Sequence, residues 1–224
     1  GHSIVRPSYR ANFTSLDGQP FFGMIFDPSQ ENSRDPDDLR GGFRARRRFI
    51  GWQTFFDFGD GNVRPNKLID TTISTPLFDL PLAAIATLTP PAEPPTALPQ
   101  RNLLRHITWQ LPSGQSIAKQ MNVAALSSED LNELKDFGNN LDQSTPLWYY
   151  ILKEAEVIEN GLRLGPVGGR IVGEVIIGLL QLDRQCYLSA EPGWRPTLPQ
   201  RNGQVTGDFR MVDFLTFAGV AQFR

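Results

Sequence analysis

The chain has 224 residues, of which 40% are hydrophobic and 21% are charged, and its formal net charge at pH 7 is −2. This composition is typical of a globular protein with a sizeable core, and the near-neutral charge gives no argument for nucleic acid or an anionic membrane as a partner. No run of residues approaches the roughly 18 apolar positions of a membrane-spanning helix. Cys186 is the sole cysteine, which excludes an internal disulfide.

The first 60 residues predict short elements between long loops. Residues 3–13 carry apolar side chains at helical spacing, but Pro7 would kink such a helix or end it after one turn. Residues 27–42 are polar and rich in turn formers, which predicts a surface loop. Residues 43–58 predict a helix whose first half holds the arginines between 44 and 48. We interpret these arginines as a solvated face, with an acidic partner or a bound anionic group as the alternative.

Further helices are predicted on both sides of a proline-rich stretch. A short helix covers about 76–86, and residues 102–110 form the next one. Between them, residues 90–99 contain five prolines, which predicts an extended loop. Ser127 and Asp130 then stand in the register of a capping box, in which each side chain bonds the backbone of the other residue.

The helices that follow have predicted boundaries. Gly138 stands at the C′ position of the helix that the capping box opens. Thr145 and Pro146 predict the N-cap and the first residue of the next helix, which Gly161 ends. A last short helix is expected at 211–219, after proline-rich loops.

The segment 166–182 is apolar over most of its circumference, which predicts a buried helix. We interpret Gly169 and Gly173 as a smooth face for close contact with another helix, and an anion site at residues 165–169 as the weaker alternative. Alternating apolar and polar positions are nearly absent from the chain. The sequence therefore predicts a mainly α fold with long ordered loops, in a single domain over residues 1–224.

Standard motifs of catalysis and metal binding are missing. The sequence contains no phosphate-binding G-x-x-x-x-G-K-[ST], no H-E-x-x-H and no C-x-x-C. Its histidines are His2 and His106, and neither has a second His four residues away or a neighbouring Cys, which argues against a zinc site. Haem iron needs only one strong protein ligand on its proximal side, so a single histidine is sufficient for that metal centre.

Three stretches, in chain order, resemble the animal-type haem peroxidases of the peroxidase–cyclooxygenase superfamily, most closely its bacterial members. Residues 1–10 (GHSIVRPSYR) resemble the proximal-helix segment, with Gly-His-Ser and a proline a few residues on. Residues 98–105 (LPQRNLLR), followed by Leu-Pro at 111–112, match a second segment. Residues 147–166, from LWYY to RLGP, match the late helix pair. The resemblance covers nearly the whole chain.

The resemblance implies roles for three residues and assigns no catalytic group to this chain. His2 would bind haem iron on the proximal side. Asn102 would accept a hydrogen bond from the other imidazole N–H and so orient the ligand. Arg105 lies three residues on, which places it on the same helix face, and its planar guanidinium would meet a haem propionate.

The resemblance places the distal side upstream of residue 1, including the distal His and Gln, the catalytic Arg, the carboxylates that esterify haem and any calcium site. This chain is then expected to be the C-terminal, proximal half of the fold, beginning inside a longer precursor whose upstream part is its partner. His106 is not assigned as the distal His, because it follows Arg105 on the proximal helix. Thr-Trp-Gln at 108–110 departs from the frequent Asp-His-Gly, which affects local loop contacts.

The implied activity is reduction of hydrogen peroxide at ferric haem, with oxidation of halide or organic small-molecule donors. The isolated chain is expected to be inactive. Two alternatives stay open: a non-catalytic protein of the same fold used for binding or assembly, and a fatty-acid dioxygenase, whose radical Tyr would lie three residues before His2. The chain is expected to be soluble, with secretion left open.

Overall fold

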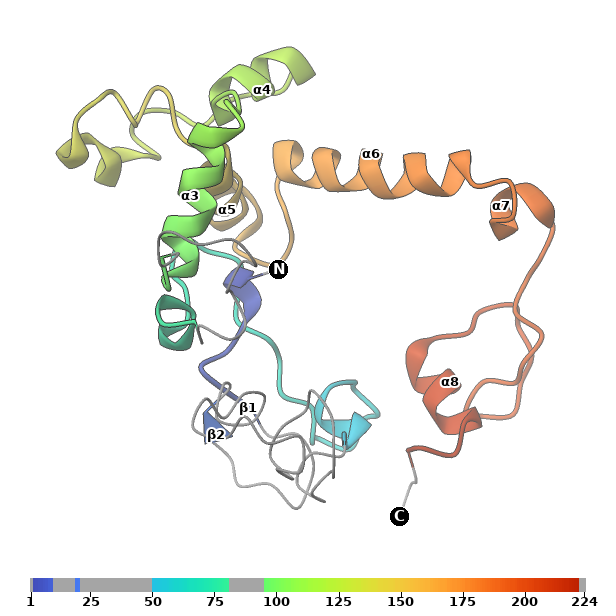
Figure 1. The fold of residues 1–224 in the computed structure, drawn as a ribbon. Coiled ribbons are helices and arrows are strands. Elements are labelled where there is room, and N and C mark those ends of the chain that lie inside the picture. The colour runs from blue at the N-terminus through green and yellow to red at the C-terminus, as the bar shows by residue number, and fades with distance from the viewer. Residues whose placement is uncertain (1, 10–18, 21–49, 81–94, 222–224) are drawn as a thin grey trace, which may run out of the picture. The chain divides into compact units, whose positions relative to one another are not determined.

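The computed structural model describes residues 2–9, 19–20, 50–80 and 95–221, and these residues are mainly helical, as predicted (Figure 1). A two-residue antiparallel pair sets Ser8 opposite Pro20 and Tyr9 opposite Gln19. The elements in chain order are η1 (His2–Ile4), β1 (Ser8–Tyr9), β2 (Gln19–Pro20), η3 (Trp52–Thr54), η4 (Thr75–Phe78), α3 (Leu98–Thr108), α4 (Gly114–Met121), η5 (Asn132–Phe137), α5 (Leu147–Glu159), α6 (Pro166–Leu182), α7 (Tyr187–Ala190) and α8 (Met211–Phe217). Among these described helices, none combines the length and the apolar character that crossing a bilayer requires.

The chain divides into two compact units. The first consists of residues 1–6 and 66–179, and the second of residues 7–65 and 180–224. The first unit contains η1, the helices α3 to α5 and most of α6, so all three residues of the predicted site belong to it. The predicted single domain over residues 1–224 stays a prediction.

Tyr150 lies at the centre of the core of the first unit. Its side chain is fully buried, and its hydroxyl accepts a hydrogen bond from Leu126 N at 2.9 Å. A Cβ at Gly114 would lie 1.9 Å from Tyr150 Cγ, so α4 can begin against this ring only with glycine. Around Tyr150 the buried side chains of the cluster are Ala118, Leu126, Leu131, Leu134 and Val167.

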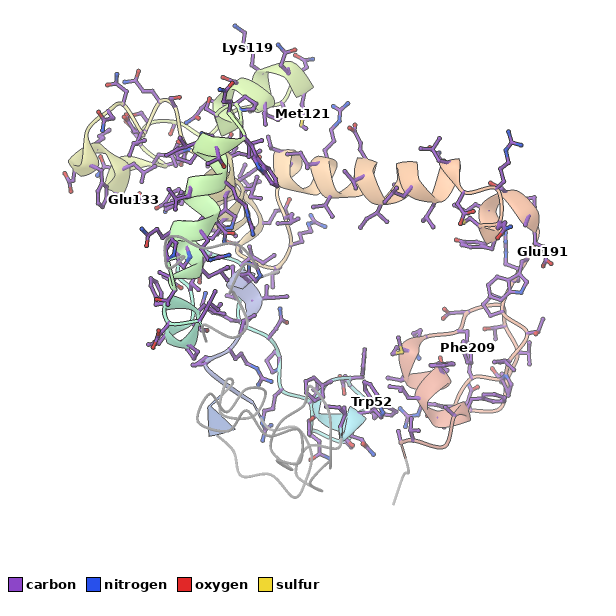
Figure 2. All side chains as sticks on the ribbon, in the orientation of Figure 1. Trp52, Lys119, Met121, Glu133, Glu191 and Phe209 are labelled. Carbon is purple, nitrogen blue, oxygen red and sulfur yellow. The ribbon has the colours of Figure 1, made fainter. Side chains whose placement is uncertain are left out.

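Polar contacts hold α5 against η5 on the outside of this core. Lys153 Nζ lies 3.1 Å from Glu133 Oε1 and 3.3 Å from Glu156 Oε1, and the hydroxyl of Tyr149 donates to Glu133 Oε1 at 2.9 Å. Glu133 is labelled in Figure 2. Burial, together with the facing Glu133 carboxylate, raises the pKa of Tyr149 to about 12. Tyr149 therefore remains a hydrogen-bond donor throughout the physiological pH range.

A buried carboxylate joins α5 to α6. Glu154 is fully buried, and its two oxygens accept hydrogen bonds from Val167 N at 3.0 Å, while Oε2 also accepts one from Gly168 N at 3.1 Å. Free N–H groups at a helix N-terminus favour an anion. The glycine-rich start of α6 does hold an anion, and that anion is the glutamate of the neighbouring helix. A Cβ at Gly165 would lie 2.4 Å from Glu154 Cγ, so this position requires glycine.

The predicted contact face of α6 is wrong in its position. Close packing occurs at Gly168, where a Cβ would lie 3.1 Å from Ile151 Cβ on α5. A Cβ at Gly173 would have nothing within 4 Å, and one at Gly169 would meet only Leu164. The glycine spacing predicted a contact face at Gly169 and Gly173, whereas the turn of α6 that meets α5 is the one that contains Gly168.

The predicted burial of α6 holds only for its first turn. Val167 and Gly168 are buried, because this turn packs on α5 and the core around Tyr150. Later side chains are exposed, at 43% for Val172 and 59% for Val175. An apolar composition predicted burial, but in the described part of the chain only the N-terminal end of the helix is covered.

Several local predictions are confirmed. Ser127 N and Oγ both donate to Asp130 Oδ2, at 2.8 and 2.7 Å, and Asp130 N donates to Ser127 Oγ at 3.1 Å, which is the predicted reciprocal capping. The element that follows is a 3₁₀ helix, and it ends at Gly138 with a φ of 69°.

The predicted N-cap of α5 is wrong. Thr145 does not cap this helix: its buried hydroxyl donates to Leu141 O at 2.7 Å, and Pro146 occupies the N-cap.

The second unit has a small core of its own, formed by Phe58, Leu215 and Ala221. Asp213 is buried on α8, where Oδ1 accepts from Arg201 N and Oδ2 from Arg210 N, both at 2.9 Å. This carboxylate closes the start of α8 and ties it to the preceding loop. Trp52, labelled in Figure 2, packs against the same core.

Candidate functional site

The segment that carries His2 is held by the stretch 67–74. Ser3 is 2% exposed, and its Oγ donates to Asp70 O at 2.7 Å and accepts from Asp70 N at 3.0 Å. Lys67 N donates to Ile4 O at 3.2 Å, and the Ser74 hydroxyl donates to Val5 O. Four hydrogen bonds therefore hold residues 3–5, and three of them are made within a three-residue helix that is too short to be stable alone.

The stretch 67–74 is in turn fixed to α5. Ile69 N donates to Gly161 O at 2.8 Å, and both the backbone N–H and the hydroxyl of Thr71 lie 3.4 Å from Glu156 Oε2. Gly161 has a φ of 72°, and a Cβ there would lie 2.9 Å from Ile69 O, so only glycine permits this approach. The position of His2 thus depends on residues more than 60 positions away in the sequence.

Asn102 and Arg105 lie on α3, which begins at Leu98 with Pro99 in its first turn. Their spacing of three residues places them on one face, as predicted, and Arg105 Nη1 donates to Asn102 Oδ1 at a long 3.4 Å. Asn102 Nδ2 is buried, and among the described residues it has no acceptor. A buried amide N–H without an acceptor costs free energy, so this atom marks a place where a polar partner fits.

The structure brings Arg105 into electrostatic reach of His2. Partial burial lowers the pKa of His2 most, the charge of the N-terminal amino group comes second, and the charge of Arg105 contributes least. All three effects favour the neutral imidazole, which is the form that binds a metal ion. Residues 2 and 105 therefore lie within electrostatic range of each other in the first unit.

Other sequence-predicted features lie elsewhere. Within the described ranges, no hydrogen bond joins His2 to Asn102, whose oxygen has a second lone pair beside the Arg105 contact. His106 Nδ1 accepts from Leu147 N at 3.4 Å, so this histidine faces the start of α5. The arginine cluster between 44 and 48 lies outside the described residues. In the part of the chain that the structure describes, no three or more His, Cys, Asp or Glu side chains form a metal-binding group.

Sequence reasoning missed the residues that hold the His2 segment. Ser3 belongs to the Gly-His-Ser stretch, but nothing in that stretch indicates that its hydroxyl is buried against Asp70. The carboxylate of Asp70 accepts from Thr72 N at 2.8 Å and from Thr72 Oγ1 at 2.6 Å, and it pairs with Lys67. The available signal was the mostly polar segment 70–75, interrupted only by Ile73, which is typical of any surface loop.

Comparisons of the chain with protein-family models, with curated proteins and with solved structures give no match.

Proposed function

We propose that this chain supplies the proximal side of a haem peroxidase site, with His2 as the iron ligand. The observation that supports this most is that the charge of Arg105, on α3, lowers the pKa of His2, so these two residues lie within electrostatic range of each other. Asn102 lies one helix turn from Arg105 and accepts a long hydrogen bond from it. These are the three residues to which the resemblance gives haem-binding roles, and those roles rest on the resemblance.

The residues present fit a haem group. The imidazole of His2 is partly covered but accessible, and it favours its neutral form. Arg105 is an exposed cation whose planar fork suits a carboxylate. Asn102 Oδ1 has a free lone pair that can accept from an imidazole N–H, while its buried Nδ2 has no acceptor in the described part of the chain. A neutral imidazole, a cation and an amide oxygen with a free lone pair fit a metal ligand, a propionate partner and an orienting group.

Haem bound here would supply the reduction of hydrogen peroxide and the oxidation of halide or organic donors. The chain's own residues prepare that chemistry. His2 would donate one ring nitrogen to the iron, and its other N–H would be directed to Asn102 Oδ1, which fixes ring orientation and basicity. Arg105 would hold a propionate with its planar guanidinium.

We also propose that the upstream part of the same precursor forms the distal wall and is the main partner of this chain. The resemblance assigns the distal groups and any calcium site to that part. Exposed apolar side chains on α3 support a partner surface on this helix: Leu104 is 42% exposed and Ile107 is 70% exposed. Apolar side chains that gather on a surface favour an interface.

Reconstitution tests this function. The chain alone should bind haem weakly and show negligible peroxide-dependent oxidation of iodide or guaiacol, and addition of the upstream part should restore both. Oxygenation of a fatty acid instead of donor oxidation would favour the dioxygenase. A stable assembly that binds haem without either activity would favour the binding protein. Tight haem binding and full turnover by the chain alone would contradict the proposed partner.

A further inference from the structure

We infer that Ser3 is a positioning residue, whose hydroxyl fixes the direction in which the adjacent His2 presents its imidazole by bonding both backbone groups of Asp70. The inference rests on the proposed function, because the direction of the imidazole matters only if His2 is the iron ligand. It adds Ser3 and Asp70 to a site to which the resemblance gave only His2, Asn102 and Arg105.

The Ser3 hydroxyl both donates and accepts a hydrogen bond. Oγ donates to Asp70 O at 2.7 Å and accepts from Asp70 N at 3.0 Å, and the side chain is 2% exposed. A side chain that bonds the N–H and the C=O of the same residue has no freedom to rotate without losing one bond. Because His2 immediately precedes Ser3 in the same single 3₁₀ turn, the backbone from which its ring projects is restrained as well.

Asp70 provides a rigid partner for this hydroxyl. Its carboxylate accepts from Thr72 N and from Thr72 Oγ1, and it pairs with Lys67, so the backbone of the turn is held from inside. The neighbouring Ile69 N donates to Gly161 O at the end of α5. A continuous chain of hydrogen bonds therefore connects α5 to Ser3. Metal ligands require such support, since small displacements of the ligand weaken binding.

The contacts of Ile4 and Val5 allow a positioning role of Ser3 to be distinguished from a general loss of stability. Lys67 N–Ile4 O and Ser74 Oγ–Val5 O hold the segment after Ser3, so loss of the Ser3 hydroxyl leaves two anchors in place. We therefore expect Ser3→Ala to fold and to free the His2 end specifically. Thr145→Ala is the matched control, because it removes another buried hydroxyl of the first unit that donates one hydrogen bond, to Leu141 O, and accepts one, from Gln115 Nε2, both far along the chain from His2.

Two measurements on the assembled protein test the inference. Hydrogen exchange of the Asp70 amide should be about tenfold faster in Ser3→Ala, because this N–H loses its acceptor, and unchanged in Thr145→Ala. In the haem-loaded ferrous protein, resonance Raman spectroscopy should show a shifted or broadened iron–histidine stretching band in Ser3→Ala. Haem should also dissociate about tenfold faster from that variant. Ser3→Thr, which keeps the hydroxyl, should restore the band and the exchange rate.

The outcomes distinguish this inference from the proposed function. If His2→Gly abolishes the iron–histidine band while Ser3→Ala leaves its frequency and width unchanged, the proposed function stands and the positioning role is wrong. If His2→Gly leaves the band in place, His2 is not the ligand, and both ideas are overturned together. An unchanged Asp70 exchange rate in Ser3→Ala would show that the two hydrogen bonds do not hold the segment.

Discussion

Replacing Glu154 with Gln should destabilise the α5–α6 junction more than any surface substitution on the same helices. The buried carboxylate receives two backbone N–H groups at 3.0–3.1 Å. Hydrogen bonds to a charged group contribute about 1.5–3 kcal/mol each, and an anion at a partly buried helix N-terminus contributes up to about 2 kcal/mol. Glutamine keeps one acceptor oxygen but turns an NH₂ group toward the second donor and removes the charge. We therefore expect a loss of about 2–4 kcal/mol in the free energy of unfolding.

Urea unfolding followed by circular dichroism measures this loss, and hydrogen exchange at Val167 and Gly168 places it at the start of α6. Glu174→Gln is the matched control: the same substitution removes an exposed carboxylate that pairs with Arg170, and it should cost under about 1 kcal/mol. If Glu154→Gln costs no more than Glu174→Gln, or if the Val167 amide stays equally protected, the buried cap does not stabilise this junction.

The remaining predictions concern Gly165, Asp70 and Asp213. Gly165→Ala should destabilise the chain by about 1–3 kcal/mol, because the added Cβ would overlap Glu154. Gly173→Ala should stabilise it by up to about 1 kcal/mol, because a Cβ there would meet nothing within 4 Å. A higher melting temperature for Gly165→Ala than for Gly173→Ala would contradict the packing. Burial opposes ionisation of Asp70, but hydrogen bonds from Lys67 and Thr72 outweigh it and lower the pKa of this carboxyl. The stability that ionised Asp70 contributes is therefore fully present above its unfolded-state pKa of about 4, and it is lost as the pH falls through its folded-state pKa. As the pH falls, hydrogen exchange of the Ile69 and Thr72 amides should lose protection in the wild type and much less in Asp70→Asn. The same loss of protection in both proteins would show that Asp70 is not the group responsible. Asp213→Ala should cost about 2–4 kcal/mol in the second unit, because two backbone N–H groups lose their acceptor, and unchanged protection of the Arg201 and Arg210 amides would contradict it.

Local sequence signals predicted local structure well. The Ser127–Asp130 pairing, the glycine that ends η5 and the C-terminal helix at Met211 each depend on residues within a few positions of one another. Capping and turn preferences operate at that range, so the pattern contains the information. The spacing of Asn102 and Arg105 on one helix face is a prediction of the same kind.

Predictions that depended on partners far along the chain were less complete. The stripe of glycines in α6 gave no indication that Gly165 and Gly168 meet α5, nor that a glutamate twelve residues before the helix fills its N-terminus. Ser3 gave no signal of its bonds to Asp70. Such contacts are decided by the packing of whole elements, which neither periodicity nor composition specifies. For the site, the residues were chosen by resemblance, and the structure adds how they are held.

The most direct test of the account is the identity of the iron ligand. His2→Gly and His106→Ala should be compared in the assembled, haem-loaded protein by ferric absorption and electron paramagnetic resonance spectra, before and after addition of free imidazole. We predict that His2→Gly loses the five-coordinate high-spin ferric signal of a histidine-bound haem, that imidazole restores it, and that His106→Ala retains it. An unchanged signal in His2→Gly, or its loss in His106→Ala alone, would contradict the central claim.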